Sequence, residues 1–101
     1  MKTWQQGDVL GRAIGALPKK LKKKENTVVA LGEATGHKHE VVGAGVECYE
    51  DEKGNIFISA PQGGRIQHEE HHAIELPPGN YSIGIVQEYD HFAEEARRVA
   101  D

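Results

Sequence analysis

Three stretches of alternating apolar and polar residues constrain the fold of this chain more than any other feature. They are residues 46–50, 56–60 and 81–89. Because successive side chains of a β-strand point to opposite faces, this alternation is typical of strands with one buried face. The first two stretches flank residues 51–55, where Gly54 can adopt the positive φ of a hairpin turn. The sequence therefore predicts a β-hairpin over residues 46–60 and a long strand near the C-terminus.

Further strands are predicted between the turn signals along the rest of the chain. They are residues 7–14, 27–31, 36–42, 65–70 and 73–76. About seven or eight short strands, separated by turns rich in glycine and proline, predict an all-β fold, either a small barrel or a sandwich. Residues 92–99 contain good helix formers and predict a short C-terminal helical tail.

The length of 101 residues predicts a single β domain over residues 1–101. The apolar content of 38% allows only a modest core, so contacts in a homo-oligomer would add to its stability. A single cysteine, Cys48, excludes an internal disulfide, and a reducing cytoplasmic location is the simplest expectation. No apolar run reaches the length of a membrane span, so no membrane partner is expected.

A lysine run at residues 19–24 places five lysines in six positions. Such a run can bind phosphate or an acidic partner, or it can form a solvated loop or strand edge. The formal net charge of the chain is -4, and neither arginine nor an aromatic residue accompanies the run. We therefore expect a mobile, solvated loop and no nucleic-acid partner.

Five of the six histidines fall in two short stretches, residues 37–39 and 68–72. In a strand, His37 and His39 share a face, and two adjacent imidazoles form half of a metal coordination sphere. Histidine is often partly exposed, so this pair taken alone is explained equally well by two surface residues. The second stretch changes that balance, because two groups of candidate ligands in a short chain favour a shared metal site.

The spacing within the second stretch has two interpretations. In a plain strand, His68 and His72 lie on the same face as Glu70. With a β-bulge at residues 69–70, His68 converges with His71 instead. The spacing leaves both interpretations open.

The motifs around these histidines resemble a group of small bacterial and phage-associated proteins without an assigned activity. The shared pattern is Thr35-Gly36-His37-x-His39, then His68-Glu69-Glu70-His71-x-x-Ile74-x-Leu76-Pro77, Gly79-x-Tyr81 and Gln87-Glu88-Tyr89. In that group a small residue usually stands at the position of His72. The resemblance therefore implies His68 and His71 as the ligands, and it implies no activity.

The His37-x-His39 pair also resembles the first two metal ligands of the cupin superfamily. Cupins are small β-barrels that hold a metal with His-x-His, a later carboxylate and a later histidine. Here no glutamate has the usual spacing, because Glu40 is too near His39 and Glu47 is too far from it. The Pro-x-Gly turn at residues 77–79 also follows the second histidine group instead of preceding it. The resemblance implies a fold and not an enzymatic activity.

These patterns favour a small metal-binding β-barrel protein that holds a divalent transition metal. The expected ligands are His37, His39, His68 and His71. Nitrogen donors without a cysteine pair suit a metal such as Zn²⁺, Fe²⁺, Ni²⁺ or Mn²⁺.

Two alternatives belong to other functional classes. One is a structural or oligomeric interaction module, phage-related and without metal, whose histidines line a contact surface. The other is a small cupin-like metalloenzyme in which Glu69 or Glu70 acts as a base on metal-bound water. The enzyme ranks last, because no nucleophile or phosphate-binding motif is present. The pattern points to no particular small-molecule ligand.

Overall fold

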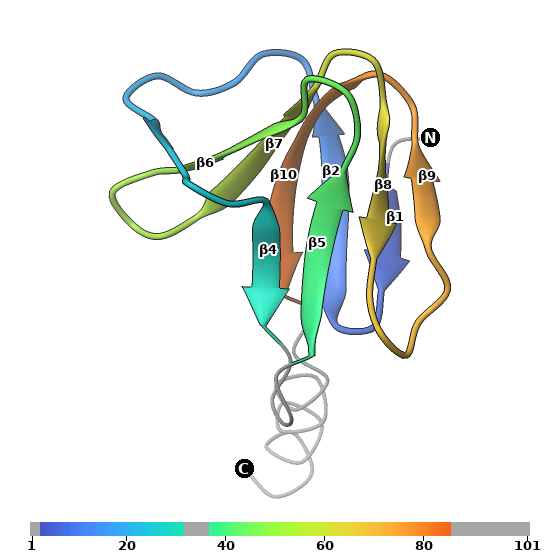
Figure 1. Cartoon of the computed structure of the whole chain (residues 1–101). Helices are drawn as coiled ribbons and strands as arrows, with labels where there is room; N and C mark the ends of the chain where they lie inside the picture. The colour runs from blue at the N-terminus through green and yellow to red at the C-terminus, as the bar shows by residue number, and fades with distance from the viewer. Residues whose placement is uncertain (1–2, 32–36, 86–101) are drawn as a thin grey trace, which may run out of the picture.

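The computed structural model describes residues 3–31 and 37–85, which form a sandwich of two antiparallel β-sheets (Figure 1). The first sheet has six strands, in the order β1 (Thr3–Gln6), β2 (Val9–Ile14), β10 (Gly79–Ile85), β7 (Ile56–Ala60), β6 (Glu47–Glu50) and β3 (Lys22–Lys23). The second sheet has four strands, in the order β4 (Val28–Leu31), β5 (Lys38–Val42), β8 (Gly64–Gln67) and β9 (Ile74–Leu76). In Figure 1 the second sheet lies in front of β2 and β10.

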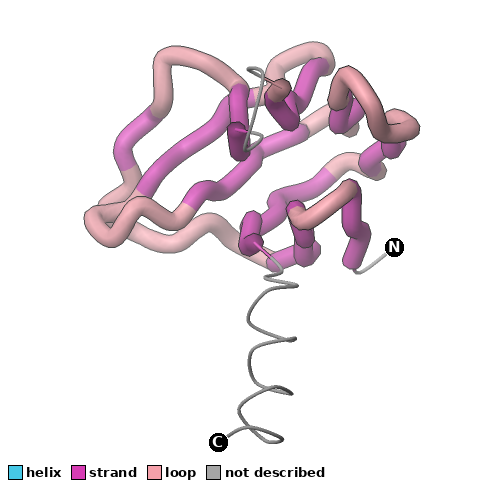
Figure 2. Tube along the Cα trace, turned by 90° about the horizontal axis from the view of Figure 1, so that it is seen from below, coloured by secondary structure: helices cyan, strands magenta, loops and turns pink. Residues whose placement is uncertain are grey.

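The all-β prediction is confirmed, and the strand pairing shows the sandwich alternative. Every described element is a strand or a loop (Figure 2). The described part of the chain contains ten strands, more than predicted, because β1 and the two-residue β3 are added at the sheet edges. The helical tail predicted over residues 92–99 lies outside the described residues. Among the residues described, no helix is long and apolar enough to cross a membrane.

The hairpin predicted over residues 46–60 is present as β6 and β7. Its register runs from Glu47 opposite Ser59 to Glu50 opposite Ile56. The Asp51 carboxylate closes the turn by accepting hydrogen bonds from the backbone N–H groups of Lys53 and Asn55. Gly54 adopts a φ of 86°, as the turn requires. Local side-chain chemistry is therefore sufficient to explain this hairpin.

The N-terminal strand prediction was incomplete, because a second strand precedes it. Gly7, with a φ of 60°, forms the turn of a hairpin in which β1 pairs with β2. The inward face of β1 carries Trp4 and Gln6, which are both buried. A buried glutamine does not produce an apolar alternation, so the pattern did not reveal β1.

Three further predictions are corrected by the structure. The apolar residues 27–31 form the predicted strand as β4, but they were expected to be buried, and only Val29 is buried while Leu31 is 75% exposed. The strand predicted over residues 65–70 ends at Gln67, and a loop follows it. The lysine run was expected to be a loop, but Lys22 and Lys23 pair with β6 as an exposed edge strand. Because an edge strand is paired on one side only, its apolar content is a weak guide to burial.

The core lies between the two sheets and draws on both. Its buried apolar residues are Trp4, Val9, Val29, Val41, Cys48, Ile58, Ala60, Ile66, Leu76 and Tyr81. Trp4 lies opposite Gly11 in the β1–β2 ladder, and a Cβ at Gly11 would overlap its indole ring. The absence of a side chain at Gly11 therefore lets the indole lie against the backbone of β2.

The buried thiol of Cys48 is expected to be unreactive in the folded protein. Cys48 is only 1% exposed, and burial raises its pKa from 9.0 to about 11. At pH 8 this pKa lowers the reactive thiolate fraction roughly 100-fold. Titration with a chromogenic disulfide reagent should therefore label Cys48 slowly in buffer and rapidly in concentrated urea. Rapid stoichiometric labelling of the folded protein would contradict this prediction.

Candidate metal centre

The two histidine stretches meet at one end of the four-stranded sheet. His39 lies in β5, and His37 immediately precedes this strand. His68 and His71 lie in the loop between β8 and β9. Since β5 pairs with β8, with Val41 opposite Ile66, this loop lies beside the start of β5. The turn between β1 and β2 lies at the same end of the sandwich (Figure 1).

The structure brings the imidazole rings of all four predicted ligands into one cluster. The ring centroids of His39 and His68 are 4.3 Å apart, and those of His68 and His71 are 4.6 Å apart. The third side of this triangle, from His39 to His71, is 6.0 Å. His37 adjoins the triangle through His68, at 5.5 Å. We call His39, His68 and His71 the histidine triangle.

His71 and not His72 joins the triangle. The ring of His71 lies against those of His39 and His68, whereas the exposed His72 contributes its backbone carbonyl to a hydrogen bond with Gln6. The pairing implied by the family resemblance, His68 with His71, is the arrangement that the structure contains. It arises in a loop and not in a bulged strand.

The ring separations are close to those of metal-bound imidazoles, but the ring nitrogens do not converge on one point. Two imidazoles on a tetrahedral metal, with metal–nitrogen distances of about 2.0 Å, have ring centroids roughly 5 Å apart. The triangle brackets this value. Within residues 3–31 and 37–85, however, no group of three or more His, Cys, Asp or Glu side chains has the geometry to hold a metal ion. The rings would have to turn for their nitrogens to meet at one point.

Gln6 determines which nitrogen of His39 carries the proton. Its amide nitrogen donates to the backbone carbonyls of Ile66, at 3.2 Å, and His72, at 2.8 Å. Its amide oxygen lies 2.9 Å from Nδ1 of His39. Because that oxygen can only accept, Nδ1 must be the donor, and Nε2 carries the lone pair. This is the tautomer in which a histidine can bind a metal through Nε2.

The surroundings of His39 keep its imidazole neutral. His39 is 2% exposed, and this burial is the main cause that lowers its pKa. The neighbouring His68 lowers the pKa further, whereas the carboxylate of Asp8 opposes the shift. Metal binding requires a neutral imidazole, so burial favours the protonation state that a ligand needs.

The β1–β2 turn contributes two contacts that the sequence patterns did not reveal. A Cβ at Gly7 would lie 2.7 Å from Nε2 of His71, so that ring approaches the turn closely. Oδ1 of Asp8 lies 3.7 Å from Nε2 of His39. Gln6 and Asp8 were missed because they lie more than 25 residues before the first histidine stretch. The only local signal was the turn at Gly7.

The two glutamates of the second stretch are already engaged with protein groups. Glu69 accepts the backbone N–H of Lys38 at 2.9 Å, and this hydrogen bond lowers its pKa. The N–H of Glu70 donates to Nδ1 of His68 at 3.0 Å, and its carboxylate lies 3.6 Å from Nδ1 of His37. Because Nδ1 of His68 accepts this hydrogen bond, the proton of the neutral ring is on Nε2. His68 must therefore turn away from Glu70 before Nε2 can offer a lone pair to a metal.

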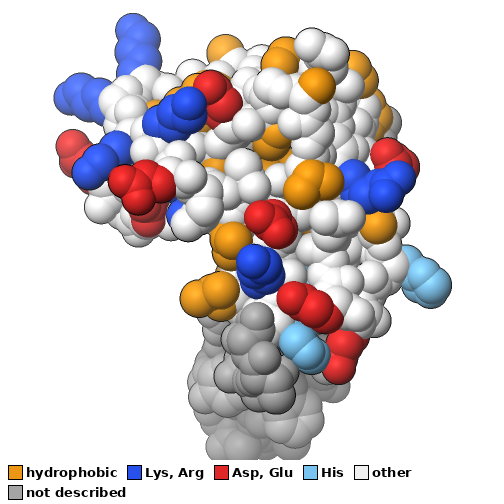
Figure 3. Space-filling view, viewed as in Figure 1, with side chains coloured by type: hydrophobic (Ala, Val, Ile, Leu, Met, Phe, Trp, Pro, Cys, Tyr) orange, Lys and Arg blue, Asp and Glu red, His pale blue; other side chains and the backbone are white. Residues whose placement is uncertain are grey.

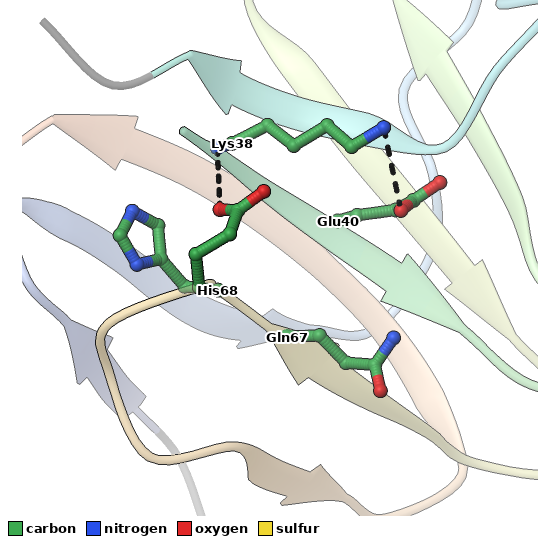
Figure 4. Close-up of a pocket in the computed structure, with 5 residues that line it drawn as sticks. Lys38, Glu40, Gln67 and His68 are labelled. Atoms are coloured by element: carbon green, nitrogen blue, oxygen red, sulfur yellow. Dashed lines mark hydrogen bonds and ion pairs between the residues drawn. The ribbon is translucent and has the colours of Figure 1, made fainter. Parts of the chain in front are cut away.

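A shallow polar pocket of about 220 Å³ lies beside the cluster. Figure 4 shows Lys38, Glu40 and Gln67 around it, with the imidazole of His68 at one end. Lys38 and Glu40 form a long ion pair of 3.9 Å across its rim. In the space-filling view, a histidine and several acidic side chains lie at the lower end of the described molecule, whereas most Lys and Arg side chains lie at the upper left, together with other acidic ones (Figure 3).

The model of one protein family, described as a domain of unknown function (DUF8820), matches residues 5–86. This chain belongs to the DUF8820 family. No curated protein and no solved structure matches the chain. The DUF8820 match includes Gln6, Asp8 and the whole histidine cluster, so the candidate site belongs to the family domain. Membership supports the predicted resemblance to small uncharacterised proteins, and it does not confirm the cupin resemblance.

Proposed function

We propose that this DUF8820 domain binds one divalent transition metal at the histidine triangle. His39 is the anchor of the site, His68 and His71 complete the triangle, and His37 lies at its margin. The candidate metals are Zn²⁺, Fe²⁺, Ni²⁺ and Mn²⁺, of which Zn²⁺, Fe²⁺ and Ni²⁺ suit imidazole nitrogen donors best.

The hydrogen bond from His39 to Gln6 is the observation that carries this proposal. A carbonyl acceptor behind a metal-binding histidine fixes the tautomer and the orientation of the ring. Gln6 supplies such an acceptor, and both N–H groups of its own amide are used to hold it in place. Nε2 of His39 therefore carries a lone pair, and the carboxylate of Asp8 lies on that side of the ring. Any buried histidine needs a partner for its N–H, and here that partner also leaves Nε2 free to face Asp8.

The positions of the other two rings favour binding with a small rearrangement. His71 is exposed and His68 is only partly buried, so both rings can turn without disrupting the core. His39 is fixed by contrast. A rigid first ligand with two adjustable partners explains how the rings can lie together while their nitrogens do not yet converge.

Elemental analysis of protein purified without a histidine tag tests this proposal. We expect one transition metal per chain, removable with a chelator and restored by Zn²⁺. Metal at 100 times its dissociation constant should stabilise the fold by about 2.7 kcal/mol. For a domain of about 100 residues, that raises the melting temperature by roughly 11–22 °C. Mg²⁺, which prefers oxygen ligands, should give no rise. The absence of both bound metal and thermal stabilisation would refute the proposed function.

A further inference from the structure

We propose that Asp8 is a direct carboxylate ligand of this metal ion. The ligand set is then His39, His68, His71 and Asp8, and His37 stands outside it. This inference rests on the metal binding proposed above, and it names a ligand that no sequence pattern indicated.

The distance between Asp8 and His39 supports this assignment. Two ligand atoms bound to one tetrahedral metal at about 2.0–2.1 Å lie roughly 3.3 Å apart. Oδ1 of Asp8 and Nε2 of His39 are 3.7 Å apart, so a shift of a few tenths of an ångström lets both reach one ion. The Asp8 side chain is half-exposed and free to make that shift, whereas His39 is held by Gln6.

The β1–β2 turn is held against the site by the two residues that precede Asp8. Gln6 hydrogen-bonds to His39. Gly7 leaves room for His71, whose Nε2 would be only 2.7 Å from a Cβ there. Two members of the histidine triangle thus contact this turn, at the two residues directly before Asp8. The turn therefore presents Asp8 to the same space that the triangle faces.

His37 has a weaker claim to the fourth position. The centroid of its ring is 5.5 Å from that of His68, and among the described residues this is its one ring contact with the triangle. Its Nδ1 lies 3.6 Å from the carboxylate of Glu70. His37 was expected to share a strand face with His39, but β5 begins at Lys38, so His37 lies just before the strand. His37 thus contacts the triangle through His68, whereas the β1–β2 turn contacts His39 and His71.

A carboxylate ligand also changes what the metal does to the fold. Three neutral imidazoles do not reduce the 2+ charge of a divalent ion, whereas one carboxylate lowers the net charge of the site by one unit.

The ion would also join the β1–β2 turn of the six-stranded sheet to the end of the four-stranded sheet. Metal binding should therefore protect backbone amides of β1 and β2 from hydrogen exchange as well as those of β5 and β8.

Asp8→Asn tests the inference, with Glu70→Gln and His37→Ala as comparison variants. We expect Asp8→Asn to weaken Zn²⁺ affinity by at least about 10-fold, since even residues behind the ligands typically contribute 10- to 100-fold. Both comparison variants should stay within roughly 3-fold of the original protein, because the Glu70 side chain is 70% exposed and His37 contacts the triangle through the ring of His68. Asp8→Glu, which keeps the carboxylate, should recover part of the affinity.

Two further measurements distinguish the loss of a metal ligand from a loss of folding stability and from a long-range effect of the removed charge. With chelator present, Asp8→Asn should unfold at the same urea concentration as the original protein, because Asp8 is half-exposed on a turn. The visible spectrum of the Co²⁺-loaded protein should change in Asp8→Asn and not in Glu70→Gln. Unchanged affinity and an unchanged Co²⁺ spectrum in Asp8→Asn, with loss in His37→Ala, would overturn the inference and leave the proposed metal binding intact. A wild-type chain that binds no metal would overturn both.

Discussion

Replacing His68 and His71 together by alanine is expected to abolish metal binding and the metal-dependent rise in melting temperature. The same result is expected when His37 and His39 are replaced together, although these residues lie about 30 positions earlier in the chain. Both results follow if the rings surround one ion, because two imidazoles alone hold a transition metal weakly. Elemental analysis and thermal unfolding with and without Zn²⁺ provide the measurement.

His72→Ala is the matched control for these two variants. His72 neighbours His71 in sequence, its side chain is exposed, and it contacts Gln6 only through its backbone carbonyl. An alanine preserves that carbonyl, so metal content and stability should stay unchanged. Full metal content in either double variant would show that the two stretches do not form a single site. Loss of metal in His72→Ala would show instead that the loop uses a different histidine.

The two double variants should differ in the absence of metal, and this difference tests the architecture of the site. Removing His68 and His71 leaves the core intact, because neither side chain is fully buried. Removing His39, which is 2% exposed, leaves the oxygen of Gln6 buried without its donor. An unsatisfied buried polar group costs about 1–3 kcal/mol. With chelator present, only the variant that lacks His39 should therefore unfold at a clearly lower urea concentration.

Replacing Gln6 by alanine is expected to lower the free energy of unfolding by roughly 2–4 kcal/mol. Gln6 is 3% exposed and satisfies three groups at once, namely the buried carbonyl of Ile66, the partly buried carbonyl of His72 and the buried Nδ1 of His39. Its removal leaves all three without a partner and opens space beneath β1. Urea denaturation followed by the fluorescence of Trp4, the only tryptophan in the chain, measures the effect.

Gln5→Ala provides the control for this prediction. Gln5 is the adjacent residue of β1 and has the same side chain, but it is exposed and donates only to the carbonyl of Gly7. Its replacement should change the free energy of unfolding by no more than about 0.5 kcal/mol. Gln6→Ala should also weaken metal binding, because His39 loses the acceptor that fixes its tautomer. Equal stability of the two variants would mean that the buried hydrogen bonds of Gln6 contribute little.

The sequence by itself determined the conformation of the elements whose signals are local. Alternation over residues 46–60, with Gly54 in the turn, was sufficient for the β6–β7 hairpin, because adjacent strands need only a suitable turn to pair. The all-β class followed from repeating this logic along the chain. The two histidine stretches were evident as candidate ligands, since imidazole chemistry does not depend on the fold.

Tertiary structure determined which of these groups meet. The pairing of β5 with β8 sets His39 beside His68, and the β8–β9 loop selects His71 over His72. The burial of Gln6 depends on carbonyls that lie 60 and 66 residues further along the chain. A polar residue in a core position is stable only when such distant partners are present, and no local pattern encodes them. Asp8 lies close to His39 for the same reason: the packing of one sheet on the other places the β1–β2 turn near β5.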